Sequence, residues 1–449
     1  MGTETCIIGI YRPFQLQPFA APNFVMRRYI PMRFCSARSM RMNIRGNRRW
    51  HSVTGAGVED GIDSKDSKDT FAVPPDVGIG EALSLSEQFL VAAGDPEATD
   101  AAPHLVASAT GKLRGPSAVS ELRRLVAGIS GVEDASKEGG IGPEMARRLD
   151  ALLRRRGLCR EPVQYLVGEW DFHCLENLAL KPPVLIPRPE TEELVELALA
   201  EAKLRLQMGE WGGLDRPLRI LDIGAGTGAI GLAILKSLQG NDYTGTGTPA
   251  VVVALEPNSV AAALATHNAA TQGLSSHYRC FHGSLASFRS EMERADPDTP
   301  GDSLLDCLVC GGGDGFDLIV SNPPYIPAKD METLMPEVKE YEDFGALCGG
   351  EDGLDVVREI VDAAPSLLRR QTDTHDEMLR PSIFLEVDPT HPRILEDWLR
   401  PRRIALNTKG EGSNIDHTTA EPLQQREVTW LESHEDLAGK ARFCVMGVA

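Results

Sequence analysis

The sequence predicts an α/β fold in which a small helical domain precedes a doubly wound, mostly parallel sheet, expected to span residues 166–449. From about Leu218 onward, short apolar runs that end in turn residues alternate with helical stretches, as in LRILDIGAG followed by GAIGLAILKSL. Strands that alternate with helices indicate a parallel sheet with helices on its faces. Upstream, between about 81 and 165, apolar residues recur three and four positions apart, which predicts short helices.

The N-terminal residues 1–50 carry nine arginines, no lysine and a single acid, Glu4. An Arg-rich, Ser-containing and acid-poor start is typical of a transit peptide, and we expect a mitochondrial destination, with a plastid as the alternative. A disordered basic arm, or a translation start at Met26 or Met32, are the other interpretations. The polar stretch that follows, residues 51–80, is rich in Gly, Asp, Ser and Lys and predicts a disordered linker.

The predicted helical domain, residues 81–165, contains two amphipathic stretches, SELRRLVAGI at 120–129 and EMARRLDALLRRRG at 144–157. Gly157 is expected to cap the second helix, because glycine readily adopts the left-handed conformation that ends many helices. We expect the basic residues Arg154–Arg156 to form a solvated helix end, and contact with a macromolecular partner is the alternative.

The charge balance limits the partners. The chain has 46 basic and 65 acidic residues, a net charge of -19. Because phosphate contacts need Lys and Arg, this balance argues against a nucleic-acid substrate. No apolar run reaches the roughly 18 residues of a membrane span, so we expect no membrane partner. We also expect the protein to be a monomer. Cys307 and Cys310 form a C-x-x-C pair without the second pair of a zinc site, so no metal is expected.

A glycine-rich turn follows the first apolar run of the predicted sheet. In LDIGAGTGAIGLAIL, Gly224, Ala225, Gly226, Thr227 and Gly228 lie between a strand and a helix. Glycine allows a sharp turn and a close approach of a ligand, and ligands of open α/β sheets bind beyond the carboxyl ends of the strands. The G-x-G-x-G spacing is not the G-x-G-x-x-G of dinucleotide binders, which favours a cofactor without phosphates, namely S-adenosylmethionine.

Glu256 ends the next apolar run, VVVALEPN, where its carboxylate can accept hydrogen bonds from both ribose hydroxyls of that cofactor. The gap from Gly224 exceeds the usual ~20 residues, and an insertion near 239–249 explains it. Further surface insertions, rich in Gly, Asp, Pro and Thr, are expected near 289–315 and 404–428. A plain strand-to-helix turn is the alternative interpretation of the glycine loop. The presence of Glu256 at the end of the next predicted strand disfavours that alternative.

The stretch Ser321-Asn322-Pro323-Pro324-Tyr325 ends a later apolar run at the same edge of the sheet. Proline fixes φ and has no N–H, so the two prolines hold the asparagine and its neighbouring carbonyls in one geometry. A planar NH₂ group can donate one hydrogen to the Asn322 side-chain oxygen and one to the Pro323 carbonyl, with Tyr325 against its plane. Such a clamp suits an amide or exocyclic amine, whose delocalised lone pair needs orientation toward the methyl sulfonium. A rigid turn is the alternative.

Asn-Pro-Pro-Tyr after a Gly-x-Gly-x-Gly strand resembles the methyltransferases of glutamine amides or adenine amines. Four further stretches closely resemble the release factor glutamine methyltransferases, the PrmC/HemK family: EPVQYLVGEWDF (161–172), LIPRPETEELVELAL (185–199), PEVKEYEDFGALCGGEDGLD (336–355) and DLAGKARFCVMG (436–447). The resemblance covers roughly residues 81–447, insertions excepted. It implies a Rossmann-like methyltransferase domain preceded by a small helical substrate-recognition domain.

The resemblance also implies roles for single residues. S-adenosylmethionine is expected against the glycine loop and Glu256, with Leu285 nearby, although the family often has an acid and an aromatic residue where Ser284 and Leu285 stand. Asn322 is expected to contact both cofactor and substrate, and the next three residues to shape a glutamine slot. Two more positions match the family: Arg188, expected at the rim of the active site, and Glu386, a strand-end acid followed by Asp388 where the family usually has Gly.

The sequence therefore predicts an organellar methyltransferase, and the resemblance implies that it transfers a methyl group from S-adenosylmethionine to the glutamine of the Gly-Gly-Gln loop of a peptide chain release factor. In-line transfer needs no metal and no covalent enzyme intermediate. One alternative is a methyltransferase of the adenine amino group in DNA or RNA, which requires base extrusion and a basic groove. Another is a non-catalytic assembly protein on the same scaffold, which an eroded glycine loop or clamp would indicate; both motifs are intact.

Overall fold

The structure is a computed structural model in which most of the chain downstream of residue 70 is described. The predicted transit peptide, most of the predicted linker, the 120–129 stretch except Leu122, and the Cys307/Cys310 pair lie outside the described residues. The described residues are 71–111, 122, 140–208, 217–239, 249–294, 315–369, 379–408 and 426–448, with the backbone alone at 401–408.

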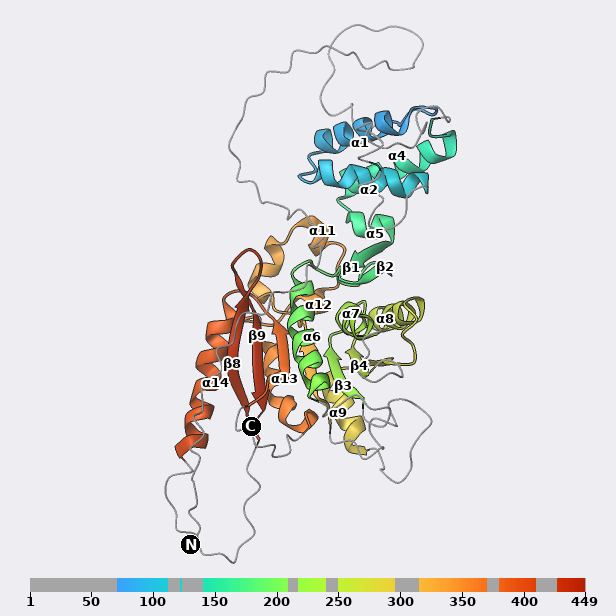
Figure 1. Cartoon of the computed structure of the whole chain (residues 1–449). Helices are drawn as coiled ribbons and strands as arrows, with labels where there is room; N and C mark the ends of the chain where they lie inside the picture. Colours follow the sequence, from blue (N-terminus) through green and yellow to red (C-terminus); the bar gives the residue numbers. More distant parts are fainter. Residues whose placement is uncertain are drawn as a thin grey trace, which may run out of the picture. The chain divides into compact units, whose positions relative to one another are not determined.

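A seven-stranded sheet in the order β5-β4-β3-β6-β7-β9-β8 forms the centre of the fold (Figure 1). Strands β3 to β7 are parallel, and the last two strands form an antiparallel hairpin at one edge. The predicted doubly wound, mostly parallel α/β fold is confirmed. The strand bounds are β3 Leu218–Ile223, β4 Ala250–Glu256, β5 Tyr278–His282, β6 Leu318–Ser321, β7 Ile383–Glu386, β8 Val428–Glu435 and β9 Ala441–Val448.

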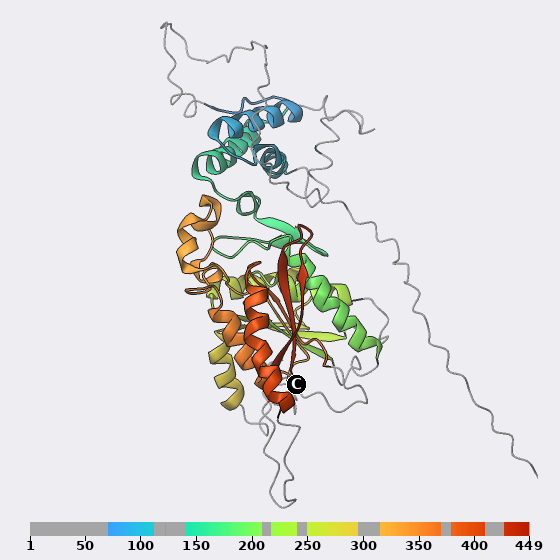
Figure 2. The same cartoon turned by 90° about the vertical axis from the view of Figure 1, so that its left-hand side faces the viewer.

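Helices cover both faces of the sheet because the strands are apolar on both sides (Figure 2). In β3, Leu218 and Ile220 belong to the core cluster with α6, α7 and α8, whereas Leu221 and Ile223 belong to the cluster with α9, α13 and α14. Strands buried on both faces are typical of parallel sheets. The helix bounds are α6 Thr191–Gln207, α7 Ala229–Leu238, α8 Ser259–Thr271, α9 Leu285–Arg294, α13 Asp355–Leu367 and α14 His391–Thr408.

Short elements complete the part of the fold that contains the sheet. A two-stranded hairpin precedes α6, and three short helical turns follow β6 in the segment that leads to α13. Their bounds are β1 Glu169–Phe172, β2 Leu175–Ala179, η1 Ala328–Thr333, α11 Pro336–Lys339 and α12 Phe344–Leu347.

The upstream helices α1 Ile79–Ala93, α2 Ala98–Thr110, α4 Pro143–Cys159 and α5 Val163–Val167 share a separate hydrophobic core. The expected cap at Gly157 is wrong, because α4 continues to Cys159 and ends at Arg160, whose φ is 60°. Helix packing requires a glycine at this position, because a Cβ on residue 157 would lie 2.8 Å from the Phe89 ring. Glycine thus lets α4 pack closely against α1.

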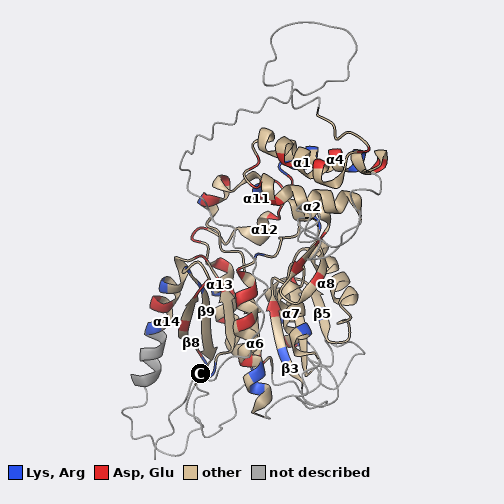
Figure 3. Ribbon diagram, turned by 45° about the horizontal axis from the view of Figure 1, so that its top comes forward, with Lys and Arg blue, Asp and Glu red and all other residues tan. Residues whose placement is uncertain are grey.

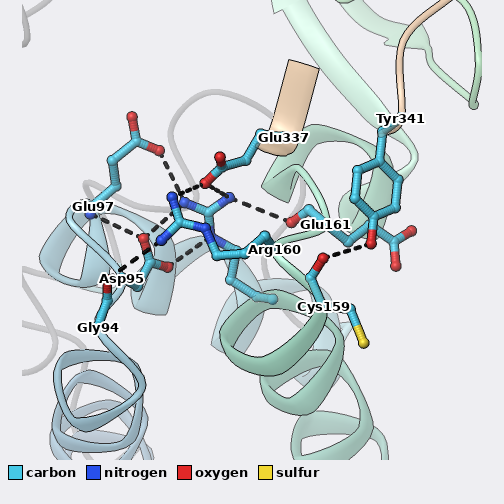
Figure 4. Close-up of polar contacts among 9 residues, drawn as sticks. Gly94, Asp95, Glu97, Cys159, Arg160, Glu161, Glu337 and Tyr341 are labelled. Atoms are coloured by element: carbon cyan, nitrogen blue, oxygen red, sulfur yellow. Dashed lines mark hydrogen bonds and ion pairs between the residues drawn. The ribbon is translucent and has the colours of Figure 1, made fainter. Parts of the chain in front are cut away.

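The expectation of a solvated helix end is wrong for Arg156, whose side chain is 1% exposed. Its Nε and Nη2 donate to the two carboxylate oxygens of Asp95 at 2.6 and 2.8 Å, and Nη2 also donates to Glu97 at 3.1 Å. Arg160 pairs with Glu337 of α11, which lies 3.4 Å from Nη1 of Arg156 (Figure 4). The guanidinium was not expected inside because its carboxylates come from the distant α1–α2 corner and from the segment after β6.

Basic and acidic residues both occur along the described ribbon (Figure 3). Within the described ranges, no helix is long and apolar enough to cross a membrane. The same part of the chain contains no cluster of three or more His, Cys, Asp or Glu side chains that could bind a metal ion.

Arg156→Ala tests the buried ion pair. It should lower the free energy of unfolding by about 3–5 kcal/mol, because Asp95 is left buried without its counter-charge. Arg147→Ala on the same helix is the matched control, since the Arg147–Glu144 pair is exposed, and it should change the free energy by less than about 1 kcal/mol. Urea unfolding followed by circular dichroism measures both, and equal midpoints for the two variants would contradict this account.

Candidate active site

The glycine loop after β3 leaves open space beside its backbone. Gly224 and Gly226 have φ of 74° and 56°, the left-handed region in which side chains are strained. A Cβ built on either residue would meet no atom within 4 Å. The left-handed backbone explains the glycines, and the open space beside them provides room for a ligand at the carboxyl end of the strand, where such sheets bind cofactors.

Glu256, the last residue of β4, fixes this loop. Its Oε2 accepts a hydrogen bond from the Gly226 N–H at 2.8 Å, and its Oε1 accepts one from the Asn258 N–H at 2.8 Å. The residue is only 6% exposed, and burial raises the pKa of its carboxyl. Each carboxylate oxygen retains acceptor capacity for a ligand hydroxyl. The sequence predicted a ribose acceptor here but not the anchor for the loop.

Asp222 lies beneath the loop, and the sequence analysis did not identify it. Its Oδ2 accepts from the Gly231 N–H in the first turn of α7 at 3.0 Å. Burial raises the pKa of this fully buried carboxyl to about 7. Its Oδ1 and the nearby Tyr278 hydroxyl are buried without a hydrogen-bond partner among the described residues. Asp222 thus ties β3 to the start of α7, whose position sets the end of the loop.

Leu285 is the first residue of α9 and is 5% exposed. It belongs to the hydrophobic core on the side of the sheet that α9, α13 and α14 cover. Its predicted place near the adenine remains a prediction.

Asn322 follows β6, and its side chain is held from one side. The Asn322 Nδ2 donates to Thr191 Oγ1 at 3.1 Å. The preceding Ser321 donates from its hydroxyl to the Ile223 carbonyl at 2.6 Å, which joins the end of β6 to the end of β3. Pro323 is buried and Pro324 is half-buried. The asparagine therefore leaves the sheet in a constrained direction, as its two prolines predict.

Glu386, the last residue of β7, joins Asn322 and Tyr325 in one hydrogen-bond network. Thr191 Oγ1 donates to Glu386 Oε2 at 2.7 Å, and the Tyr325 hydroxyl donates to Glu386 Oε1 at 3.4 Å. Glu386 is 1% exposed, and burial raises its pKa to about 7. Burial likewise raises the pKa of Tyr325. Thr191, missed in the sequence analysis, lies three residues after Arg188 in the stretch IPRPETEE.

Arg188 is attached to the segment that follows β6. Its Nη2 donates to Glu342 Oε2 at 2.6 Å, and its side chain is 31% exposed whereas that of Glu342 is 1% exposed. Burial raises the pKa of the Glu342 carboxyl. The neighbouring Asp343 accepts from the Asn258 Nδ2 at 2.9 Å. Because Asn258 also donates its backbone N–H to Glu256, these contacts connect the partly exposed arginine to the glycine-loop side of the site.

Several curated proteins that are similar to this chain are named release factor glutamine methyltransferases. The "MTRF1L release factor glutamine methyltransferase" of Homo sapiens is 33% identical over 366 residues, which covers 80% of this chain and 92% of the human protein. The chain belongs to the release factor glutamine methyltransferase family. Two bacterial proteins named "Release factor glutamine methyltransferase" match as well. That of Geobacter sulfurreducens is 39% identical (51% of this chain, 64% of that protein), and that of Gloeobacter violaceus is 33% identical (56% and 74%).

No family model matches the chain. Among solved structures, the hMettl16 catalytic domain in complex with an RNA hairpin has a TM-score of 0.33 at 14% identity, over 70% of this chain and 84% of that chain. A likeness this distant adds nothing to the assignment. Family membership confirms the predicted family and the enzyme class, an S-adenosylmethionine-dependent methyltransferase. The adenine methyltransferase and the non-catalytic scaffold are not favoured.

The geometry of this methyltransferase fits its cofactor at the glycine loop. The open space lies beside Gly224 and Gly226, and the Glu256 carboxylate stands next to it with acceptor capacity for hydroxyls. The structure thus brings the glycine loop together with Glu256, and Asn322 with Tyr325 through Thr191 and Glu386. Arg188 contacts neither group directly, and it is linked to the glycine-loop side through Glu342, Asp343 and Asn258.

Gly226→Val should reduce the affinity for S-adenosylmethionine at least about tenfold in a folded chain, because the side chain would fill the space beside the loop. Gly273→Val is the matched control: Gly273 has φ of 72° and equally open surroundings, but it lies in the turn after α8 and is not part of the loop. Both variants have a similar backbone strain. Calorimetric titration measures the affinity, and an unchanged affinity in a folded Gly226→Val protein would contradict the placement of the cofactor.

Proposed function

We propose that this protein transfers a methyl group from S-adenosylmethionine to the side-chain amide nitrogen of the glutamine in the Gly-Gly-Gln loop of a peptide chain release factor. The observation that supports this most is the orientation of the Asn322 carboxamide. Its Nδ2 is engaged by Thr191, and within the described ranges no group donates to its Oδ1. An acceptor at the end of β6 is therefore available for a planar NH₂ group.

The glutamine NH₂ would donate one hydrogen to Asn322 Oδ1 and the other to the Pro323 carbonyl. When bound, S-adenosylmethionine supplies an electrophilic methyl group on a sulfonium. Holding the amide nitrogen in line with this group supplies orientation, and accepting its hydrogens favours the positive charge that develops on nitrogen. The nitrogen would give its lone pair to the new N–C bond while the S–CH₃ bond of the cofactor breaks and its electron pair returns to sulfur, so that S-adenosylhomocysteine would leave as the second product. The methylated nitrogen would then lose one proton to water.

The other residues of the site would bind and align. Gly224 to Gly228, Glu256 and Leu285, with Asn322, would hold the cofactor. Pro323, Pro324 and Tyr325 would shape the glutamine slot, and Arg188 would contact the substrate at the rim. The net charge of -19 suits a protein substrate better than a nucleic acid, because phosphate contacts need Lys and Arg.

The domain division follows from the same function. We assign residues 81–165 to recognition of the release factor and residues 166–449 to catalysis, with surface insertions near 239–249, 289–315 and 404–428. We also propose that the enzyme acts as a monomer.

Asn322→Ala should lower the rate of methyl transfer by about 10²–10³-fold, because a preorganised polar contact to the reacting group is lost. The affinity for S-adenosylmethionine should stay within about tenfold, since the main task of Asn322 is to orient the substrate. Asn322→Asp should also fall well below wild type, because its charge lies beside the sulfonium and misplaces the nitrogen. Transfer of labelled methyl to a purified release factor measures the rate.

The substrate offers its own control. A release factor whose loop glutamine is replaced by glutamate should accept no methyl group at that site, because it has no NH₂ to present. Near-wild-type turnover by Asn322→Ala on an intact release factor would refute the clamp. More efficient methylation of adenine in a nucleic acid than of any release factor would refute the proposed substrate.

We also propose that residues 1–50 direct the enzyme into mitochondria, or into plastids where the cell has them. The support is the excess of nine arginines over one acid in this segment. A fluorescent fusion of residues 1–50 should enter the organelle, and the same fusion with all nine arginines changed to glutamine should not. Diffuse signal from fusions starting at Met1 and at Met26 would overturn the assignment.

A further inference from the structure

A chain of hydrogen bonds runs from the carboxylate of Glu386 to the carboxamide of Asn322. Thr191 lies between them, with its Oγ1 at 2.7 Å from Glu386 Oε2 and 3.1 Å from Asn322 Nδ2. All three come from different elements: the end of β7, the first residue of α6 and the residue after β6. Thr191 is 3% exposed and Glu386 1% exposed, so water does not compete for the bond between these two residues, whereas Asn322 is half-buried.

The direction of each bond in this chain is determined by the number of available hydrogens. An ionised carboxylate can only accept, so the single hydroxyl hydrogen of Thr191 must point to Glu386. The Thr191 oxygen then has only lone pairs for its other neighbour. Asn322 must therefore turn its NH₂ toward Thr191, which leaves its Oδ1 on the opposite side. A flipped carboxamide would bring two acceptors together.

We propose that Glu386, acting through Thr191, positions the Asn322 carboxamide so that its oxygen, and not its NH₂ group, faces the substrate amide. The inference rests on the proposed function for its substrate, but the orientation of the side chain can be tested without one. Thr191 and Glu386 are positioning residues, because neither has to touch the glutamine. If the Asn322 carboxamide were flipped, its NH₂ group would face the NH₂ group of the substrate glutamine, and two hydrogen-bond donors would meet.

Protonation of Glu386 would reverse the pattern. A neutral carboxyl can donate to Thr191, whose own hydrogen is then free to point at Asn322 and to favour the flipped amide. Burial raises the pKa of Glu386, Glu190 raises it further, and Arg442 together with the Thr191 and Tyr325 hydroxyls lower it, leaving it at about 7. Since the ionised form is the productive one, the rate should rise with pH through about 7.

Thr191→Val keeps the shape of the side chain but removes the hydroxyl. It should lower kcat for the release factor about 10²-fold while the affinity for S-adenosylmethionine changes less than about threefold. Thr191→Ser, which restores the hydroxyl, should recover kcat to within about threefold of wild type. Thr266→Val is the matched control, because it deletes a threonine hydroxyl that bonds the Ala262 carbonyl within α8, outside the proposed site and the proposed recognition domain, and it should leave kcat unchanged.

Glu386→Gln supplies a second arm that does not depend on the Thr191 variants folding. Because glutamine does not titrate, the rise in kcat through about pH 7 should disappear, although kcat itself falls by up to about tenfold. A low-pH limb that persists in folded Glu386→Gln, or a folded Thr191→Val with wild-type kcat, would overturn the inference.

The third arm needs neither cofactor nor release factor. In the full chain labelled with ¹⁵N-asparagine, the Asn322 NH₂ signals, assigned by their loss in Asn322→Ala, should titrate near pH 7 in wild type and remain constant in Glu386→Gln. A pH-independent signal in wild type would refute the positioning role. If wild type fails to methylate any release factor while this titration is present, the proposed substrate is wrong and the positioning inference stands.

Discussion

The register of the parallel strands is the constraint on which the whole site depends. Ile223 of β3 pairs with Leu255 of β4 and with Ser321 of β6, and Ser321 pairs with Leu385 of β7. The residue after each of these positions belongs to the site: Gly224, Glu256, Asn322 and Glu386. Because side chains alternate between the faces of a sheet, a slip of one residue in any strand would turn its functional group to the opposite face.

The hydrophobic core maintains this register on both faces of the sheet. The apolar residues of β3 divide between two core clusters, one on each face, so a one-residue slip of β3 would turn the buried Asp222 to the opposite face and away from the Gly231 N–H that it accepts. The hydrogen bond between the glycine loop and Glu256 depends on the same register, because the N–H that Glu256 accepts belongs to Gly226, two residues beyond Gly224. Packing energy spread over many side chains thus fixes a few polar groups to within hydrogen-bond distance of each other.

The residues that sequence reasoning identified are those whose type and position are informative locally. Glycines at the end of a strand, an acid at the end of the next and Asn-Pro-Pro-Tyr each predict a conformation from a few neighbours. Thr191 gave no such signal, because its partners Asn322 and Glu386 are 131 and 195 residues away in the chain. Only the folded sheet brings them together.

The predictions for Gly157 and Arg156 in the helical region were wrong for the same reason: contacts with residues distant in the sequence decide both positions. Gly157 lies in the middle of a helical turn because the Phe89 ring packs where its Cβ would be. Arg156 is buried because Asp95 and Glu337 supply its counter-charges from distant segments. Local helix rules describe neither contact. The edge strand β8 was also missed, since its sequence VTWLESHE is largely polar and its pairing with β9 depends on the completed sheet.

The central claim is that the end of β6 presents an acceptor to the side-chain amide of a glutamine. Tandem mass spectrometry of a release factor incubated with the full chain and deuteromethyl-labelled S-adenosylmethionine tests this most directly. The account predicts a single labelled methyl group on the side-chain nitrogen of the Gly-Gly-Gln glutamine. Label on any other residue, or an unmodified release factor beside labelled adenine in added nucleic acid, would contradict it.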